Sequence, residues 1–171
     1  FDAGWDYSFH HMMFANLAGF NYEGHTYGDM GDLSAHIDAY NQGYSDHTGQ
    51  LSYTESHDET RIVYECTNYQ DYSDEEAYDI SKLGAVILMT AEGTPMIYQG
   101  QEFGQNGTSR DGETIIPQPL QWENLSSGIA QDLFDDYATL IDLRKNRPAL
   151  KENNLVIKYQ NSGEKTISYC R

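Results

Sequence analysis

Near its centre the chain reads LSYTESHDE over residues 51–59. The first part, residues 51–55, follows Gly49 and is bounded by a polar cluster, which predicts a β-strand. His57 and Asp58 come directly after this strand. Because functional side chains of parallel α/β proteins gather where strands end and loops begin, this position marks both as candidate site residues.

Segments with helical and with strand periodicity alternate on both sides of this stretch. We expect helices over residues 7–18, 33–40, 74–92 and 133–147, and further strands over residues 1–5 and 94–98. The polar stretches 59–74 and 99–128 are expected to be loops. An order of this kind implies parallel strands joined by right-handed crossovers.

The C-terminal residues follow a different pattern. Two alternating runs, residues 155–159 and 166–169, lie on either side of Asn161, Ser162 and Gly163, which predicts an antiparallel hairpin. Phe1 and Arg171 both fall inside structured patterns. We therefore expect the chain to be a segment of a longer protein.

The composition restricts the possible partners. The formal net charge is −17, from 27 acidic and 10 basic residues, and such a surface repels nucleic acid and anionic lipid. The longest apolar run, residues 84–89, is far too short to cross a membrane. The 14 Tyr and 2 Trp offer flat faces that suit sugars, although core packing explains them equally well. The composition fits a neutral ligand, although a solvated acidic surface is the simpler explanation of the charge.

Acidic and aromatic side chains follow each of the three expected strands. Glycoside hydrolysis needs such a mixture, because one carboxylic acid protonates the leaving oxygen and a carboxylate attacks or stabilises an oxocarbenium-like transition state. The candidates are Asp2, Trp5, Asp6 and Tyr7 at the first strand end, Glu55, His57, Asp58 and Glu59 at the second, and Gln101 and Glu102 at the third.

No metal site or cofactor is expected from the spacing of ligand residues, because no zinc or calcium pattern is present. His10 and His11 are interpreted as part of a helix surface, and Glu59 as a solvated acid. Cys66 and Cys170 lie far apart and are expected to be free thiols.

Four segments carry a resemblance to the α-amylase family of glycoside hydrolases. Residues 53–59 resemble the seventh-strand signature of that family, residues 93–104 its eighth-strand segment, residues 1–7 the end of its sixth strand, and residues 119–122 a loop that often follows the eighth. The resemblance implies an α/β fold, namely the C-terminal portion of a (β/α)8 TIM barrel with about three parallel strands and their helices. Residues 1–150 would form this partial barrel, and residues 151–171 the start of an antiparallel β domain.

The resemblance also implies roles for individual residues. Asp58 matches the family's transition-state-stabilising carboxylate, and His57 the histidine that binds hydroxyls of the same sugar. Ser56 departs from the commoner Asn at its position, and Glu102 is read as structural. The family's nucleophile and general acid follow its fourth and fifth strands, so they would come from N-terminal barrel segments that this chain lacks.

The resulting hypothesis is a fragment of a retaining hydrolase or transglycosylase that acts on α-glucans such as starch or maltooligosaccharides, inactive in isolation. An alternative is a non-catalytic carbohydrate-binding or interaction module derived from the same barrel. A third reading, a metal-dependent hydrolase, would use Glu55, His57 and Asp58.

Overall fold

The computed structural model describes residues 3–107 and 118–171. Three parallel strands, β1 (Gly4–Trp5), β2 (Gln50–Ser52) and β3 (Thr94–Pro95), form one sheet in the order β1-β2-β3. Trp5 lies opposite Leu51, and Leu51 lies opposite Thr94. The expected parallel α/β arrangement is confirmed, although each strand is shorter than its sequence pattern.

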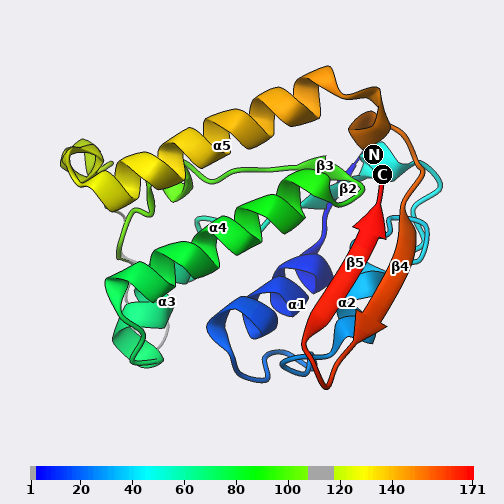
Figure 1. Ribbon diagram of the computed structural model, residues 1–171, viewed down its shortest axis with the longest axis horizontal. Helices are drawn as coiled ribbons and strands as arrows, with labels where there is room; N and C mark the ends of the chain where they lie inside the picture. The colour runs from blue at the N-terminus through cyan, green and yellow to red at the C-terminus, as the bar shows by residue number, and fades with distance from the viewer. Residues whose placement is uncertain (1–2, 108–117) are drawn as a thin grey trace.

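Five α-helices follow these strands along the chain, two after β1, two after β2 and one after β3. They are α1 (Tyr7–Ala18), α2 (Met30–His36), α3 (Ile62–Tyr69), α4 (Asp74–Thr90) and α5 (Gly128–Asn146), and four short 3-10 turns complete the described ranges. Helix α4 lies between α1 and α5 in Figure 1 and contacts both. The main core is the buried face of α1, with Phe9, Met12, Met13 and Phe14, packed against α4 and α3.

Helix α3 was not expected, because residues 59–74 were interpreted as a loop. Its buried residues Ile62, Val63 and Cys66 nevertheless recur at helical spacing, and burying them outweighs a start without a side-chain cap. The other expected helices are present, and 7–18 matches α1. The bounds of the rest differ: α2 begins and ends before the expected 33–40, α4 ends before residue 92, and α5 begins before residue 133. Both cysteines are free thiols, as expected, with Cys66 buried and Cys170 exposed.

The start of α4 is held by a reciprocal pair of hydrogen bonds. The Ser73 hydroxyl accepts from the Glu76 backbone N–H, and the Glu76 carboxylate accepts from the Ser73 backbone N–H at 2.9 Å. This capping box satisfies donors that a helix leaves unpaired in its first turn.

Ser73→Ala is expected to lower the free energy of unfolding by about 1 kcal/mol, because it leaves one of these donors without its acceptor. Denaturant unfolding measures the change. Ser127→Ala is the matched control, since Ser127 precedes α5 without a side-chain cap hydrogen bond. Equal losses for the two variants would contradict the assignment.

The expected C-terminal hairpin is present as β4 (Val156–Asn161) and β5 (Thr166–Cys170), which pair antiparallel. It packs on α2, and hydrogen bonds join it to the preceding chain. The Met30 backbone N–H donates to the Ser162 hydroxyl at 3.0 Å, the Thr90 and Tyr169 hydroxyls are bonded, and Arg171 donates to the Thr90 carbonyl at 2.7 Å. The hairpin is therefore docked on α2 and α4.

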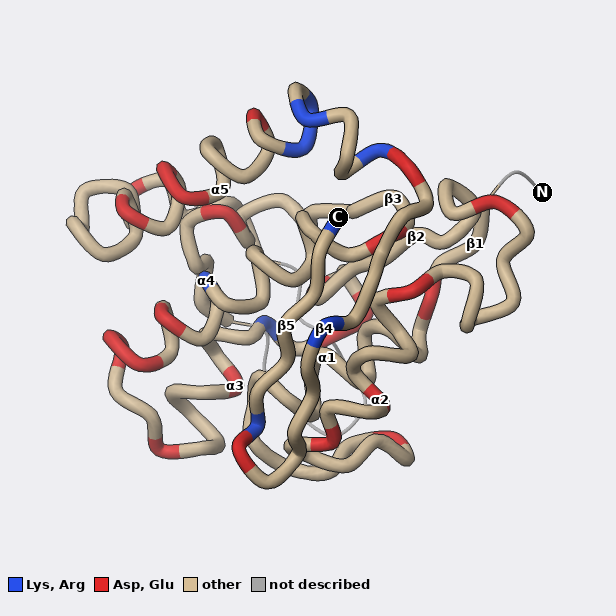
Figure 2. The backbone as a smooth tube through the Cα atoms, turned by 45° about the vertical axis from the view of Figure 1, so that its right-hand side comes forward, with Lys and Arg blue, Asp and Glu red and all other residues tan. Residues whose placement is uncertain are grey.

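Charges are unevenly distributed along the fold. Helix α5 carries acidic positions in its first half and Arg144 and Lys145 in its last turn (Figure 2). This order suits the helix dipole, which favours cations at the C-terminal end. Within residues 3–107 and 118–171, no helix is long and apolar enough to cross a bilayer.

Candidate functional site

His57 and Asp58 lie on a loop beyond the C-terminal end of β2, where the sequence predicts them. The side chains are 63% and 57% exposed, and His57 Nε2 lies 3.3 Å from Asp58 Oδ2. The Asp58 backbone N–H donates to the Ser56 hydroxyl at 3.2 Å, which turns the loop back at this point. The Trp5 ring, at the end of β1, meets the His57 ring edge-on at 5.8 Å.

Tyr53 forms the floor beneath these exposed groups. Its side chain is fully buried, and its ring centroid lies 5.4 Å from that of Trp5 and 6.1 Å from that of Tyr7. Burial raises the pKa of the Tyr53 hydroxyl well above its ordinary value, and nearby carboxylates including Glu59 add to the shift. Tyr53 is therefore a neutral support for a surface that presents Trp5 and Tyr7 to solvent.

His10 is buried, so its interpretation as a surface residue of the helix was wrong. Its ring stacks on Tyr53 with centroids 5.0 Å apart, and Nδ1 lies 3.0 Å from the Thr54 carbonyl oxygen. Nε2 lies 3.3 Å from Oε2 of Glu59, whose side chain is only 15% exposed. Glu59 is thus turned toward α1 rather than fully solvated.

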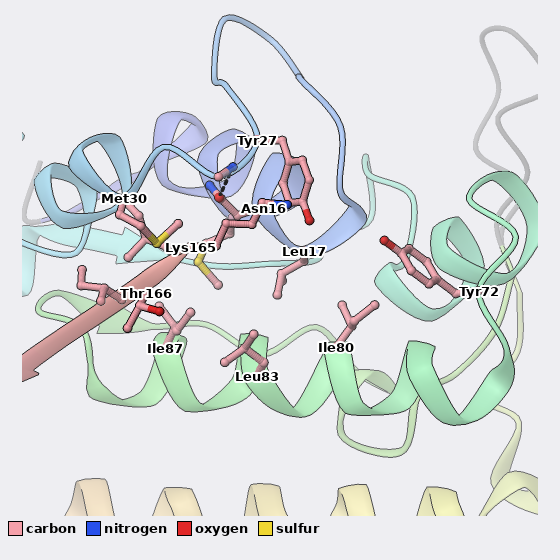
Figure 3. A pocket seen from close by; sticks show the side chains of 14 residues that line it. Asn16, Leu17, Tyr27, Met30, Tyr72, Ile80, Leu83, Ile87, Lys165 and Thr166 are labelled. Carbon is pink, nitrogen blue, oxygen red and sulfur yellow. Dashed lines mark hydrogen bonds between the residues drawn. The ribbon is translucent and has the colours of Figure 1, made fainter. Parts of the chain in front are cut away.

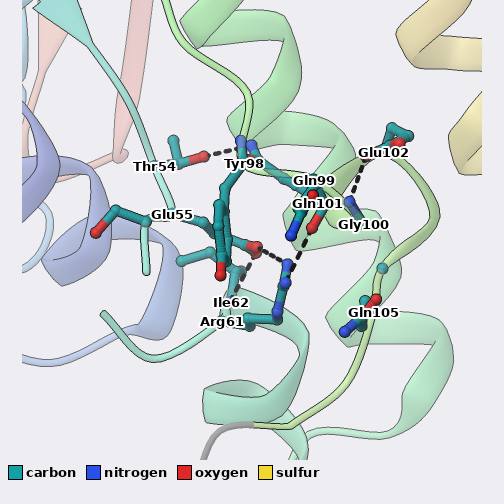
Figure 4. A network of polar contacts seen from close by, with 12 residues as sticks. Thr54, Glu55, Arg61, Ile62, Tyr98, Gln99, Gly100, Gln101, Glu102 and Gln105 are labelled. Carbon is teal, nitrogen blue, oxygen red and sulfur yellow. Dashed lines mark hydrogen bonds and ion pairs between the residues drawn. The ribbon is translucent and has the colours of Figure 1, made fainter. Parts of the chain in front are cut away.

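Glu55 does not face the exposed surface. Its carboxylate accepts from Arg61 Nη1 at 3.1 Å and from the Ile62 backbone N–H at 3.0 Å, and both charged side chains are almost fully buried. Burial raises the pKa of Glu55, and the Arg61 charge opposes that rise. Arg61 also donates to the Gln99 carbonyl and lies over the Tyr98 ring (Figure 4).

Gln101 links the ends of β2 and β3. Its Nε2 donates to the Thr54 hydroxyl and to the Tyr137 hydroxyl, both at 2.7 Å, and its Oε1 accepts from the Tyr98 backbone N–H. Glu102 accepts from the Gly100 backbone N–H at 2.8 Å, in keeping with a structural role. These contacts hold the strand ends that carry the candidate site.

Asp6 is a structural residue as well. One carboxylate oxygen accepts from the Phe9 backbone N–H and starts α1, and the other accepts from Gln50 Nε2 at 2.8 Å. Asp2 lies outside the described residues. The three-residue metal set of Glu55, His57 and Asp58 is not assembled, because the Glu55 carboxylate is buried against Arg61.

Two groups within the described ranges could each hold a metal ion. They are His10, His11 and Glu59, and His25, Asp32 and His36. The first group adjoins the loop of Asp58, and the second links α2 to the loop before it. Neither follows a spacing that a short sequence motif would reveal.

Two hollows lie away from this surface. One, of about 430 Å³, is lined by α1, α4 and the start of β5, with Leu17, Ile80 and Ile87 pointing into it (Figure 3). The other, of about 350 Å³, lies between the segment after β3 and α5. Neither is lined by His57 or Asp58.

The sequence of the chain is similar to those of known α-amylases. The sequence model of the α-amylase catalytic domain matches residues 1–128. The chain is 31% identical to the α-amylase MalA of Haloarcula japonica over 75% of its length, and 28% identical to the α-amylase SusG of Bacteroides thetaiotaomicron over 61%. It spans only 17% and 20% of the length of these two relatives.

Solved structures share the fold. A debranching enzyme of Nostoc punctiforme, soaked with acarbose, superposes with a TM-score of 0.68 at 22% identity, over 94% of this chain and 33% of that one. A pullulanase of Bacillus acidopullulyticus superposes with a TM-score of 0.75 at 14% identity, over 98% of this chain and 22% of that one.

Proposed function

The chain belongs to the α-amylase family of glycoside hydrolases, within its catalytic domain, and from this premise we propose that it carries the transition-state-stabilising Asp58 of a retaining α-glucan hydrolase or transglycosylase. His57 is proposed to bind hydroxyls of the same sugar. Starch and maltooligosaccharides are the proposed substrate class.

The exposure of Asp58 at the end of a parallel strand is the observation that supports this proposal most. Of the three carboxylates in residues 55–59, Glu55 is buried against Arg61 and Glu59 approaches His10, whereas Asp58 is more than half exposed. A carboxylate in this place can stabilise the positive charge that develops on the sugar ring. The adjacent His57 can donate hydrogen bonds to hydroxyls, and Trp5 offers an aromatic face.

The nucleophile and the general acid are proposed to come from N-terminal barrel segments that act together with this chain. Two features support this partner. In the described sheet β1 and β3 are edge strands, each paired on one side only, and closed barrels leave no such edge. The second hollow, with Ile97, Phe134 and Ile141 in its lining, opens between the segment after β3 and α5.

We expect the isolated chain to show no turnover of maltoheptaose, because a single stabilising carboxylate supplies neither a nucleophile nor a proton donor. Chromatography of the products over a day measures this. Turnover that disappears in Asp58→Asn would overturn the expectation, because it would place a complete active site within these residues.

The proposal itself is tested by completing the barrel. The whole chain, residues 1–171, replaces the corresponding segment of the Haloarcula japonica α-amylase, so that the hairpin stays with α2 and α4, and circular dichroism selects chimeras that fold. A folded chimera is expected to hydrolyse maltooligosaccharides, since the chain would supply Asp58 and His57. A folded chimera without activity would count against the proposed role.

A further inference from the structure

We propose that His10, His11 and Glu59 form a binding site for a divalent transition-metal ion, best suited to Zn²⁺, between α1 and the loop that carries Asp58. One ligand atom from each residue lies within 4.8 Å of the others. Two imidazoles and one carboxylate are a ligand set that zinc uses in proteins, with a fourth position left for water. The sequence predicts no metal here, because the spacing of its ligand residues follows no zinc or calcium pattern.

The hydrogen bonding of His10 supports the metal most directly. Its Nδ1 lies 3.0 Å from the Thr54 carbonyl oxygen, and a carbonyl can only accept, so Nδ1 carries the hydrogen. In the neutral ring Nε2 is then an acceptor, and it faces a carboxylate oxygen of Glu59 at 3.3 Å. Two acceptors so close need a cation or a second proton between them.

The burial of His10 increases the free-energy cost of leaving its Nε2 without a partner. The side chain of His10 is fully buried, and its Nε2 makes no hydrogen bond of acceptable geometry among the described residues. A buried nitrogen without a hydrogen bond costs about 1–3 kcal/mol, whereas a metal ligand satisfies it. Histidines that bind zinc usually donate their other ring N–H to a carboxylate, a backbone carbonyl or water, which fixes the orientation and tautomer of the ring. The Thr54 carbonyl accepts such a hydrogen bond from His10.

The separation of the two ligand atoms also fits a shared ion. Zinc binds nitrogen and oxygen at about 2.0–2.2 Å in tetrahedral sites, which places two ligand atoms about 3.4 Å apart. The observed distance from His10 Nε2 to Glu59 Oε2 is 3.3 Å. His11, which is partly buried and whose ring is next to that of His10 at 5.4 Å, supplies the third ligand.

The second group, His25, Asp32 and His36, has hydrogen bonds that satisfy its ring nitrogens without an ion. His25 Nδ1 lies 2.7 Å from Asp32 Oδ2, a normal hydrogen bond, and His36 Nδ1 donates to the Asp32 carbonyl oxygen at 2.9 Å. These contacts pair a donor with an acceptor, so no ion is needed. This group is therefore a matched control with the same kinds of side chain.

An ion at the first site would join α1 to the residue that follows Asp58, and would restrict the loop on which Asp58 lies. That effect on sugar cleavage rests on the proposed function, whereas the binding of the metal does not. The two are separated by measuring binding on the isolated chain, which needs no activity.

The test is a titration of the chain with Zn²⁺ in competition with a chromophoric chelator, and with Co²⁺, whose visible absorption reports a tetrahedral site. We expect one equivalent bound by the native chain, weakened by about tenfold or more in His11→Gln and in Glu59→Gln and unchanged in Asp32→Asn. Circular dichroism verifies that each variant is folded. These two ligand positions are chosen because they are partly exposed, and His10 is left intact.

Three results would overturn the proposal. The native chain could bind no Zn²⁺ at micromolar concentration, or Glu59→Gln could bind as tightly as the native chain, or Asp32→Asn could abolish binding. The first would mean that His10 and Glu59 pair without a metal, and the second that Glu59 is not a ligand of the ion. The third would place the ion at His25 and His36.

Discussion

Asp58→Asn in a complete barrel that contains this chain is expected to lower kcat by about 10²–10³-fold, the usual cost of removing one electrostatic contact with the transition state. The amide keeps the size of the side chain but removes the charge that we propose stabilises the oxocarbenium-like sugar. Because Asp58 is exposed, its folding contribution is small. Steady-state hydrolysis of maltooligosaccharides by the folded chimera and its variant measures the effect.

The matched control for this variant is Asp79→Asn. It makes the same chemical change at an exposed position on α4, and kcat is expected to stay within about twofold of the parent value. If Asp58→Asn also left kcat unchanged, Asp58 would not be the stabilising carboxylate. A rise in KM with kcat unchanged would instead indicate a role in substrate binding alone.

Arg61→Met is expected to lower the free energy of unfolding by about 3–5 kcal/mol, because it leaves the buried Glu55 carboxylate without its partner. It also removes the hydrogen bond to the Gln99 carbonyl, and with it a tie between the ends of β2 and β3. Urea unfolding at neutral pH measures the loss. Arg147→Met, at an exposed position after α5, is the control and is expected to change stability by less than about 0.5 kcal/mol.

The same variant is expected to be less destabilised in acid. Burial raises the folded-state pKa of Glu55, and Arg61 opposes the rise, so Arg61→Met raises that pKa further. A raised carboxyl pKa means that the folded state binds more protons than the unfolded state, so stability falls as the pH rises from the unfolded to the folded pKa. Unfolding from pH 4.5 to pH 8 should therefore show a difference from the native chain that grows with pH.

One further result would identify the ion pair as the cause. The double variant Glu55→Gln with Arg61→Met is expected to be more stable at neutral pH than Arg61→Met alone, because no buried charge remains. A pH-independent difference, or a double variant that is less stable than the single one, would contradict this account.

The sequence predicts the parallel order of strands, the C-terminal hairpin and the place of Asp58, because local periodicity and strand ends determine them. Helix α1 is an example, since its apolar spacing and the capping Asp6 are both local signals. Helix α3 is missed because its buried residues are few and it starts without a capping side chain. Its first residue is bonded to Glu55, a contact that only the folded chain brings about.

The environment of His10 could not be predicted for a related reason. Two adjacent histidines on a helix look like surface residues until the stacking of His10 on Tyr53 is known, and those residues are 43 positions apart. Glu59 likewise looks solvated in a chain of net charge −17. Its approach to His10 depends on how the loop after β2 folds back over α1.

The docking of the hairpin restricts how such proteins can be recombined. Met30, Thr90 and Glu92 lie before residue 150, yet each bonds to a group at or after residue 154. A crossover at residues 150–151 that brought in a foreign β domain would leave these donors and acceptors facing unmatched neighbours. Domain exchange should therefore succeed only when α2, the end of α4 and the hairpin are taken from the same parent protein.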